Sequence, residues 1–554
     1  MRKSTKAILL GAMLSGLSFN GWAQHRDYPS YSQLTARLMK IGSRYPNLCS
    51  VNTIGKTATG KEVWLLTLGR DNAENKPALV IAAGVEATQL ATVELSLQMT
   101  EQLLQAAMVQ DSVRQLLQTK TIYIFPNLNP DATEQYSEKL RWERSGNAQP
   151  MDDDRDGRIF EDPFEDLNRD GLITMMRVKD PTGPYRPSKL DPRVMVKADA
   201  AKGEKGGYLL LTEGIDNDKD GKWNEDPEGG VVFNKNFSFD FPYFQVGAGE
   251  HPMSERETKA FADFLFDAKN VYAVFVLGPT NNLSEPLKFD RSNVSKRIIT
   301  GLLEKDAAVN SQVSKLYNAT TQLKDAPKTQ PTGGDVLQWA YFHYGRYSYS
   351  TPGWWIPKQP LPKDSTYTSQ TYPEEDHEDL NFLRWAKANN VVGTFVNWTP
   401  IQHPDFPGQT VEVGGLAPYV KQTPPKHLLE PVTRQHLKFF MAYAELMPRL
   451  EIVNIKTEKV TGGLTRITAE VLNNGSLPTH SEIGDRTRWV QKVKVNLRLE
   501  KDQTLVSGPK MHLHNAIAGG DKVTVSWLVK GKGYVGVVAS SPTAGTQTKE
   551  VVLR

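Results

Sequence analysis

Three stretches of the chain place oxygen-bearing side chains at alternate positions ahead of a glycine. They begin at Asp152, Asp166 and Asp216. This spacing is how a calcium loop arranges hard oxygen ligands around one ion, with the glycine making the sharp turn. Carboxylates crowded together without a cation repel one another. We therefore predict calcium sites with these ligands: Asp152, Asp154, Asp156, Asp162, Asp166, Asn168, Asp170, Asp216, Asp218, Asp220 and Asp226.

The loops lack the glutamate that closes an EF-hand at its twelfth position, where the two longer ones carry Pro163 and Pro227. Asp162 and Asp226, one place earlier, could close the site instead. An acidic turn in contact with water is the plainer alternative. We expect bound calcium to be structural, and to hold the long loops in place rather than to take part in catalysis.

The elements that must position any site are indicated by continuous apolar runs. Such runs occupy residues 77–83, 121–126, 271–277 and 391–396, and a helical pattern covers residues 91–107. Strands buried on both faces and alternating with helices are typical of a parallel sheet covered on both sides. The predicted fold is therefore α/β, with a mixed, mainly parallel central sheet and helices on both faces.

Two regions depart from this pattern. Residues 147–230 are rich in Asp, Gly and Pro and have little periodicity, which predicts a long Asp-rich loop insertion. Residues 450–554 alternate in short apolar strands separated by Gly and Asn turns, which predicts an immunoglobulin-like β-sandwich. The body would then span residues 24–449.

The N-terminus carries an export signal. Basic residues at positions 2, 3 and 6 precede an apolar run over residues 7–19, and small residues at 21 and 23 favour cleavage after Ala23. The apolar run is too short to span a bilayer. We predict a signal peptide over residues 1–23, an exported protein that is periplasmic or secreted, and no membrane span. The net charge of +3 gives no reason to expect a nucleic-acid partner.

Several motifs resemble the carboxypeptidase A-like family of zinc metallocarboxypeptidases. Asn129-Pro-Asp131 is similar to the family's NPDG turn, residues 230–237 (GVVFNKNF) to its GVDLNRNF signature, and residues 254–259 (SERETK) to its SEPET stretch. In family order, the resemblance covers residues 28–447. It implies one zinc held by two histidines and a glutamate, a glutamate base, and an Asn-Arg pair that grips the substrate's C-terminal carboxylate.

The positions that match the family's zinc ligands and base carry other residues. The first two ligand positions are Glu86 and Gln89, the third is closest to Leu277, and Pro352 stands where the base should be. A glutamine amide is a poor zinc ligand, and leucine cannot bind metal. Zinc is therefore expected for the family but not for this chain.

At the positions that match the family's substrate-binding residues, the chain differs less from the family pattern. The Asn-Arg pair becomes Asn234 and Lys235, which keeps the positive charge without the bidentate guanidinium. Arg141 and Arg144 both lie near the place of the family's oxyanion arginine, and the sequence does not choose between them.

Three functions follow from these residues. The first is an inactive peptidase homologue that binds a peptide or protein ligand in the former active-site cleft. The second is an active metallocarboxypeptidase with a rearranged metal site that uses Glu86. The third is a calcium-stabilised scaffold or adhesion module in which the cleft is vestigial.

Overall fold

The computed structural model describes residues 27–152, 157–224, 227–360 and 377–553. Its central sheet has six strands in the order β1-β2-β4-β3-β9-β10. Strands β4, β3, β9 and β10 run parallel, while β1 and β2 pair antiparallel at one edge. The bounds are β1 Cys49–Lys56, β2 Glu62–Leu68, β3 Ala78–Ala82, β4 Thr121–Phe125, β9 Val271–Leu277 and β10 Tyr347–Thr351.

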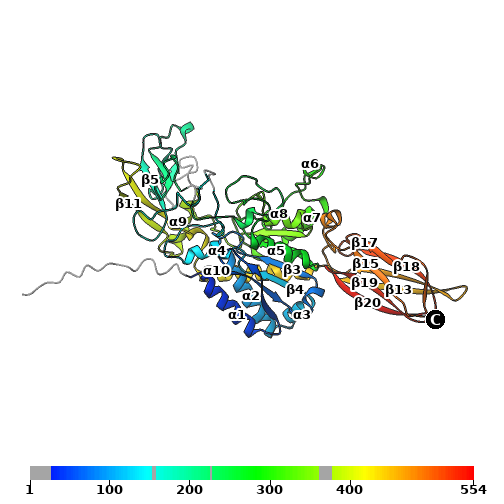
Figure 1. Cartoon of the computed structure of the whole chain (residues 1–554). Coiled ribbons are helices and arrows are strands. Elements are labelled where there is room, and N and C mark those ends of the chain that lie inside the picture. The colour runs from blue at the N-terminus through cyan, green and yellow to red at the C-terminus, as the bar shows by residue number, and fades with distance from the viewer. Residues whose placement is uncertain (1–26, 153–156, 225–226, 361–376, 554) are drawn as a thin grey trace, which may run out of the picture.

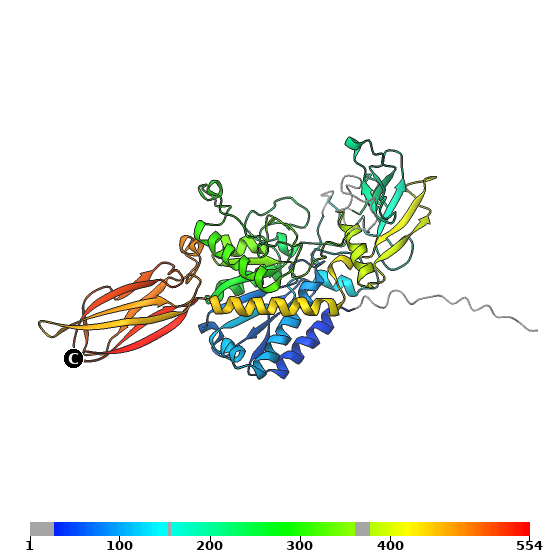
Figure 2. The same cartoon turned by 180° about the vertical axis from the view of Figure 1, so that it is seen from behind.

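Helices cover both faces of this sheet because its strands are apolar on both sides. In β3, Leu79 and Ile81 join one core cluster, and the alternating Val80 joins the other. The first cluster also contains residues of α1, α2, α3, α7 and α10, and the second contains residues of α5 and α8. Figure 2 shows α10 running across the sheet. The predicted α/β fold is confirmed. The helices are α1 Tyr31–Arg44, α2 Leu90–Val109, α3 Asp111–Thr119, α4 Pro130–Thr133, α5 Arg256–Asp267, α6 Arg291–Val294, α7 Glu304–Thr321, α8 Val336–Phe342, α9 Glu378–Ala388, α10 Lys426–Leu446 and α11 Glu482–Thr487.

A second six-stranded sheet, in the order β11-β12-β5-β8-β6-β7, differs from the prediction. Residues 147–230 were expected to lack regular structure, but they contain four of its strands, and the strand expected at 391–396 belongs here rather than in the central sheet. Of these four strands, β5 pairs with β12 of the 395–416 hairpin and with β8, and β6 pairs with β7 and β8. The pairing of β5 with β12 joins residues more than 200 positions apart, so the local sequence pattern gives little sign of it. The bounds are β5 Met175–Lys179, β6 Tyr185–Pro187, β7 Met195–Lys197, β8 Tyr208–Thr212, β11 Phe395–Ile401 and β12 Val411–Leu416.

The C-terminal strands form two four-stranded antiparallel sheets, in the orders β13-β14-β18-β16 and β17-β15-β19-β20. Their inward-facing residues, among them Ile467, Trp527 and Val537, share one core. This arrangement is consistent with the predicted β-sandwich. The bounds are β13 Leu450–Val460, β14 Leu464–Asn473, β15 Val493–Arg498, β16 Thr504–Ser507, β17 Met511–His514, β18 Lys522–Lys530, β19 Gly533–Ser541 and β20 Gly545–Leu553.

The sandwich and the second sheet lie at opposite ends of an elongated molecule, with the central sheet between them (Figure 1). The connection 474–492 of the sandwich packs back on the central domain. The buried Asp306 carboxylate accepts the backbone N–H groups of Glu482 and Ile483 at 2.8 and 3.0 Å, and the Ser481 hydroxyl donates to the Gly345 carbonyl at 2.8 Å. In the part of the chain that is described, no helix combines the length and the apolar character needed to cross a membrane.

Candidate peptide-binding cleft and calcium loops

The residues that match the family site lie at one edge of the central sheet. Strands β3, β4, β9 and β10 are parallel, so the segments that follow them, 83–89, 127–131, 278–282 and 352–353, emerge at the same edge. In open α/β sheets this carboxyl edge is where ligands bind. The structure therefore brings together four segments that are far apart in sequence.

Glu86 and Gln89 follow β3 in a tight turn that leads into α2. Burial raises the pKa of the Glu86 carboxyl, and this effect is opposed by a hydrogen bond from Ser145 and by the positive charge of Lys235. Gln89 precedes the first residue of α2, and its Oε1 atom is buried without a hydrogen-bond partner. The turn thus offers one carboxylate that is difficult to ionise and one uncharged amide.

The third ligand position provides no metal-binding group. Leu277, the last residue of β9, is fully buried in the hydrophobic core. The next residue, Gly278, is the one that faces the turn after β3, because a Cβ atom on it would lie 2.7 Å from Val85 Cγ2. Sequence comparison alone had pointed to Leu277. At either position the chain has no side-chain atom that could bind a metal.

The position of the base is occupied by a packed turn. Pro352 and Gly353 are buried, and a Cβ atom on Gly353 would lie 2.5 Å from Leu95 Cδ2 on α2. His436 on α10 is buried, and its Nε2–H donates to the Gly353 carbonyl at 2.7 Å. Neither Pro352 nor Gly353 has a side chain that could accept a proton from water.

These residues do not fit zinc. Structural and catalytic zinc sites use at least three nitrogen, sulfur or carboxylate ligands, and among the positions that match the family's ligands only Glu86 could bind zinc. Asp131, the other carboxylate at this edge, is buried and pairs with Lys61 at 3.2 Å. Among the described residues, one group brings together three acidic, histidine or cysteine side chains closely enough to hold a metal ion. It consists of Asp216, Asp218 and Asp220. That group lies in an acidic loop and includes no residue of the cleft.

Asn234 and Lys235 lie in the short 3-10 turn Phe233–Lys235 beside this edge. The buried Asn234 accepts the N–H of Val336, at the start of α8, through Oδ1 at 3.1 Å. This bond fixes the orientation of the amide and leaves its Nδ2 donor without a partner among the described residues. Lys235 is half-buried, and its Nζ donates to the Val246 carbonyl at 3.3 Å.

The surroundings of the two candidate arginines differ. Arg144 folds back on the chain that follows it, where Nε and a terminal nitrogen donate to the carbonyls of Gly146 and Asn147 at 3.0 and 2.7 Å. Burial lowers its pKa. Arg141 instead forms a β-bridge with Leu172 at the acidic insertion, and its charge acts on Asp170. Arg144 lies three residues before the insertion begins at residue 147, whereas Arg141 pairs with the insertion itself.

One residue that the sequence did not single out is Asn147, which is almost fully buried. Its Nδ2 donates to Glu255 Oε2 and Glu257 Oε1 at 2.7 and 2.6 Å, while Oδ1 accepts the N–H groups of Gln149 and Val231 at 3.0 Å each. Asn147 therefore holds the two ends of the insertion together and ties them to the start of α5. Burial raises the pKa of Glu257 to about 7.

The third acidic loop has the geometry expected of a cation site. One carboxylate oxygen from each of Asp216, Asp218 and Asp220 lies within 4.8 Å of the others. Asp216 Oδ1 is buried and lacks a hydrogen-bond partner. Asp405, from the loop after β11, accepts the N–H of Asp216 at 3.0 Å and thereby joins this loop to the second sheet.

In the other acidic loops, carboxylates accept the N–H groups of their own turn. Asp166 accepts those of Asp170 and Gly171 at 3.1 and 2.8 Å, and Asn168 Oδ1 also accepts the N–H of Asp170 at 3.0 Å. Asp152 accepts the N–H of Gly157 at 3.0 Å. Asp162 is turned toward the third loop, where it accepts the N–H of Asn217 at 3.0 Å. The predicted ligands Asp154, Asp156 and Asp226 lie outside the described residues.

Comparison with known proteins gives two family matches. A family model described as zinc carboxypeptidase matches residues 34–353, and a model described as a domain of unknown function matches residues 449–552. Among curated proteins, the chain is 27% identical over 112 residues to a zinc carboxypeptidase of Saccharothrix mutabilis subsp. capreolus, and 30% identical over 153 residues to carboxypeptidase D of Rattus norvegicus. These matches cover 20% and 27% of this chain but only 26% and 11% of the two relatives.

Among solved structures, thrombin activatable fibrinolysis inhibitor matches with a TM-score of 0.42 and 12% identity, over 75% of this chain and 73% of that one. A metallo-carboxypeptidase from Burkholderia cenocepacia matches with a TM-score of 0.31 and 12% identity, over 58% of this chain and 60% of that one.

Proposed function

We propose that this chain, which belongs to the zinc carboxypeptidase family, binds the C-terminal end of a peptide or protein in the family's cleft and does not hydrolyse it. The observation that carries the proposal is the set of residues at the carboxyl edge of the central sheet. Glu86 is the one carboxylate at the positions that match the family's ligands and base, and the remaining positions hold Gln89, Leu277 or Gly278, and Pro352. Without a metal-activated water and a base, the family's hydrolytic mechanism has no nucleophile.

Binding of a carboxylate is supported by the charges that remain. Lys235 and Arg144 supply two cations. Burial disfavours the ionisation of Glu86, and Asp131, the other carboxylate at this edge, already pairs with Lys61 at 3.2 Å. The Nδ2 donor of Asn234, oriented by its bond to Val336, adds a neutral hydrogen-bond donor. Charge-assisted hydrogen bonds to a carboxylate are stronger than neutral ones. A peptide with a free C-terminus should therefore bind better than the same peptide with a C-terminal amide.

Calorimetric titration of the full chain tests this preference for a free C-terminus. The ligands are N-acetyl dipeptides that end in Gly, Phe, Leu, Lys or Glu, each titrated as the free acid and as the amide. We expect at least one free acid to bind about tenfold tighter than its amide, and Lys235→Met to remove most of that difference. Lys259→Met is the matched control, since Lys259 is an exposed lysine on α5 that pairs with Asp263 at 2.6 Å. Equal binding of acids and amides throughout the set would refute the proposal.

Lack of hydrolysis is tested separately by metal content and peptidase assay. Protein purified without chelators or an affinity tag should contain no stoichiometric zinc by plasma mass spectrometry, and the zinc-loaded protein should release no C-terminal residue from the same peptides. The alternative is an active enzyme with a rearranged site around Glu86, which requires a tightly bound transition metal. One zinc per chain together with peptide hydrolysis would establish that alternative.

A second role, as a calcium-stabilised scaffold, is favoured by the buried Asp216 oxygen that lacks a partner and by the grouping of Asp216, Asp218 and Asp220. A ligand that binds only the folded state at 100 times its Kd adds about 2.7 kcal/mol of stability. We expect EGTA to lower the melting temperature, millimolar calcium to restore it, and Asp216→Asn to abolish this response. Asp263→Asn, on the exposed face of α5, should leave it intact. A melting temperature that does not change with calcium concentration would count against this role.

A further inference from the structure

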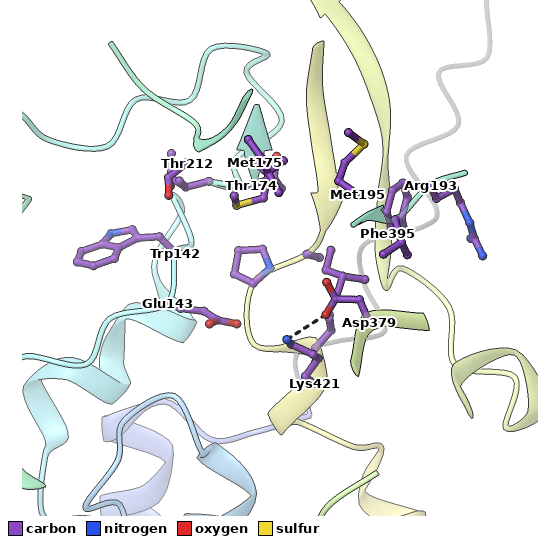
Figure 3. A pocket seen from close by; sticks show the side chains of 18 of the residues that line it. Trp142, Glu143, Thr174, Met175, Arg193, Met195, Thr212, Asp379, Phe395 and Lys421 are labelled. Carbon is purple, nitrogen blue, oxygen red and sulfur yellow. Dashed lines mark hydrogen bonds and ion pairs between the residues drawn. The ribbon is translucent and has the colours of Figure 1, made fainter. Parts of the chain in front are cut away.

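A cavity of about 360 Å3 lies between the second sheet and the segments that join it to the central domain. Its walls come from residues 142–143, from the sheet, from α9 and from residues 415–421. Figure 3 shows Thr174, Met175 and Thr212 on one side of the cavity, and Glu143, Asp379 and Lys421 on the other. The cavity contains none of the residues placed in the cleft above.

The strand register explains why one side of the cavity is apolar. In β5, Met176 and Val178 point to the face that packs with Val411 and Val413, so the alternating Met175 points to the opposite face. Met175 pairs with Thr212 across the β5–β8 ladder, which places both on the cavity face.

That face carries further apolar side chains, and the protein does not fill the space in front of them. The cavity wall includes Leu210, Met195, Phe395 and Leu416. Apolar surface that stays in contact with water is unfavourable, so a ligand that covers these side chains gains free energy. Cavities of roughly 300–1,000 Å3 with mostly apolar walls and a few placed polar groups are typical of ligand sites.

The other side of the cavity has a surplus of negative charge. Lys421 is already paired, with Asp379 at 3.1 Å and with Glu378 at 3.3 Å. Arg193 pairs with Asp191 at 2.7 Å and lies over the Phe395 ring.

Glu143 is the remaining carboxylate of the lining. It accepts the N–H of Tyr419 at 2.8 Å and forms no ion pair in the described part of the chain. Each cation of the lining thus has a carboxylate partner, and Glu143 has no cation.

We propose that this cavity is a second binding site, for a peptide segment in which a large apolar side chain adjoins a basic one. The apolar side chain would pack against Met175, Met195 and Phe395, and the basic group would pair with Glu143. Methionine side chains suit such a site because they adapt their shape to the ligand. The site lies outside the cleft and does not depend on a free C-terminus.

Ligand-observed NMR titration of the full chain with N-acetyl-Phe-Lys-amide tests the proposal, with N-acetyl-Phe-Glu-amide and N-acetyl-Gly-Lys-amide as comparators. All three lack a free carboxylate, so the result is separate from that of the cleft experiment. We expect Phe-Lys to bind with a Kd below about 1 mM and about tenfold tighter than either comparator.

Thr212→Trp places a large side chain in the cavity and should weaken binding of the Phe-Lys probe about tenfold or more. Lys179→Trp is the control, because Lys179 is exposed on the cavity face of β5 but is not part of the lining. If Thr212→Trp does not fold, Glu143→Gln decides instead, and should reduce the preference for Phe-Lys over Phe-Glu about threefold to fivefold. The proposal is overturned if no saturable binding occurs below about 10 mM, if Phe-Glu binds as tightly as Phe-Lys, or if a folded Thr212→Trp binds unchanged.

Discussion

Asn147 offers the most direct test of how the cleft is held in place. Replacing it by alanine removes four hydrogen bonds at once, two to the carboxylates of Glu255 and Glu257 and two from the N–H groups of Gln149 and Val231. All of these groups lie where the insertion leaves and rejoins the central domain. We therefore expect the loss to be local, and to loosen the segments that carry Arg144 and Asn234.

The magnitude follows from the kind of bond. Hydrogen bonds to charged groups contribute about 1.5–3 kcal/mol each and neutral ones about 0.5–1.5 kcal/mol. The lower ends of those ranges sum to about 4 kcal/mol, which corresponds to nearly a thousandfold change in a local opening equilibrium.

The isosteric variant Asn147→Asp separates charge from shape. A third carboxyl beside Glu255 and Glu257 repels both when ionised, so the variant should be destabilised more at pH 8 than at pH 5. The wild-type protein sets the baseline for this comparison. The pKa of Glu257 is raised to about 7, so its own contribution to stability falls as the pH rises from about 4.5 through about 7.

Hydrogen exchange measured by mass spectrometry reports the local opening directly. In Asn147→Ala, exchange in peptides covering residues 141–149 and 229–237 should accelerate by two to three orders of magnitude, while the C-terminal sandwich stays unchanged. Gln149→Ala is the control, because the Gln149 side chain is exposed and its N–H bond to Asn147 would remain. Acceleration of less than about tenfold, or equal acceleration in the sandwich, would refute the assigned role.

Three further predictions concern the fold and the maturation of the chain. Gly84→Ala should lower the free energy of unfolding, measured by chemical denaturation, by roughly 1–3 kcal/mol. Gly84 has φ +64°, and a Cβ atom there would lie 2.5 Å from Asn127 Oδ1. Gly207→Ala is the control and should lower it much less, because a Cβ atom there would meet nothing within 4 Å. Burial lowers the pKa of His436 to about 4, so the free energy of unfolding of the wild type should fall by up to about 3 kcal/mol as the pH falls from about 6.5 to about 4. His436→Gln should flatten this pH dependence of stability. An unchanged pH dependence in the variant would show that other groups cause it. Mass spectrometry of residues 1–554 expressed in a bacterial host should find a mature N-terminus at Gln24, whereas an intact Met1 would contradict the predicted cleavage after Ala23.

The sequence alone was sufficient to predict features that depend on a short continuous stretch of residues. Continuous apolar runs predicted β3, β4 and β9, because strands buried on both faces need apolar side chains at every position. The motif order assigned Glu86, Gln89 and Pro352 to the family's positions, and this assignment stays a prediction. The structure gathers the segments that carry these residues at one sheet edge. The acidic spacing likewise indicated Asp216, Asp218 and Asp220 as one group.

Only the tertiary structure decided what depends on partners distant in sequence. The second sheet pairs Met176 with Val413, and no local periodicity marks a strand whose neighbour lies so far along the chain. The different surroundings of Arg144 and Arg141, and the position of Gly278 beside the turn after β3, depend on contacts at the ends of strands and loops. The role of Asn147 depends on two carboxylates on α5. Motif spacing carries no information about such long-range contacts, because they form only when the chain is folded.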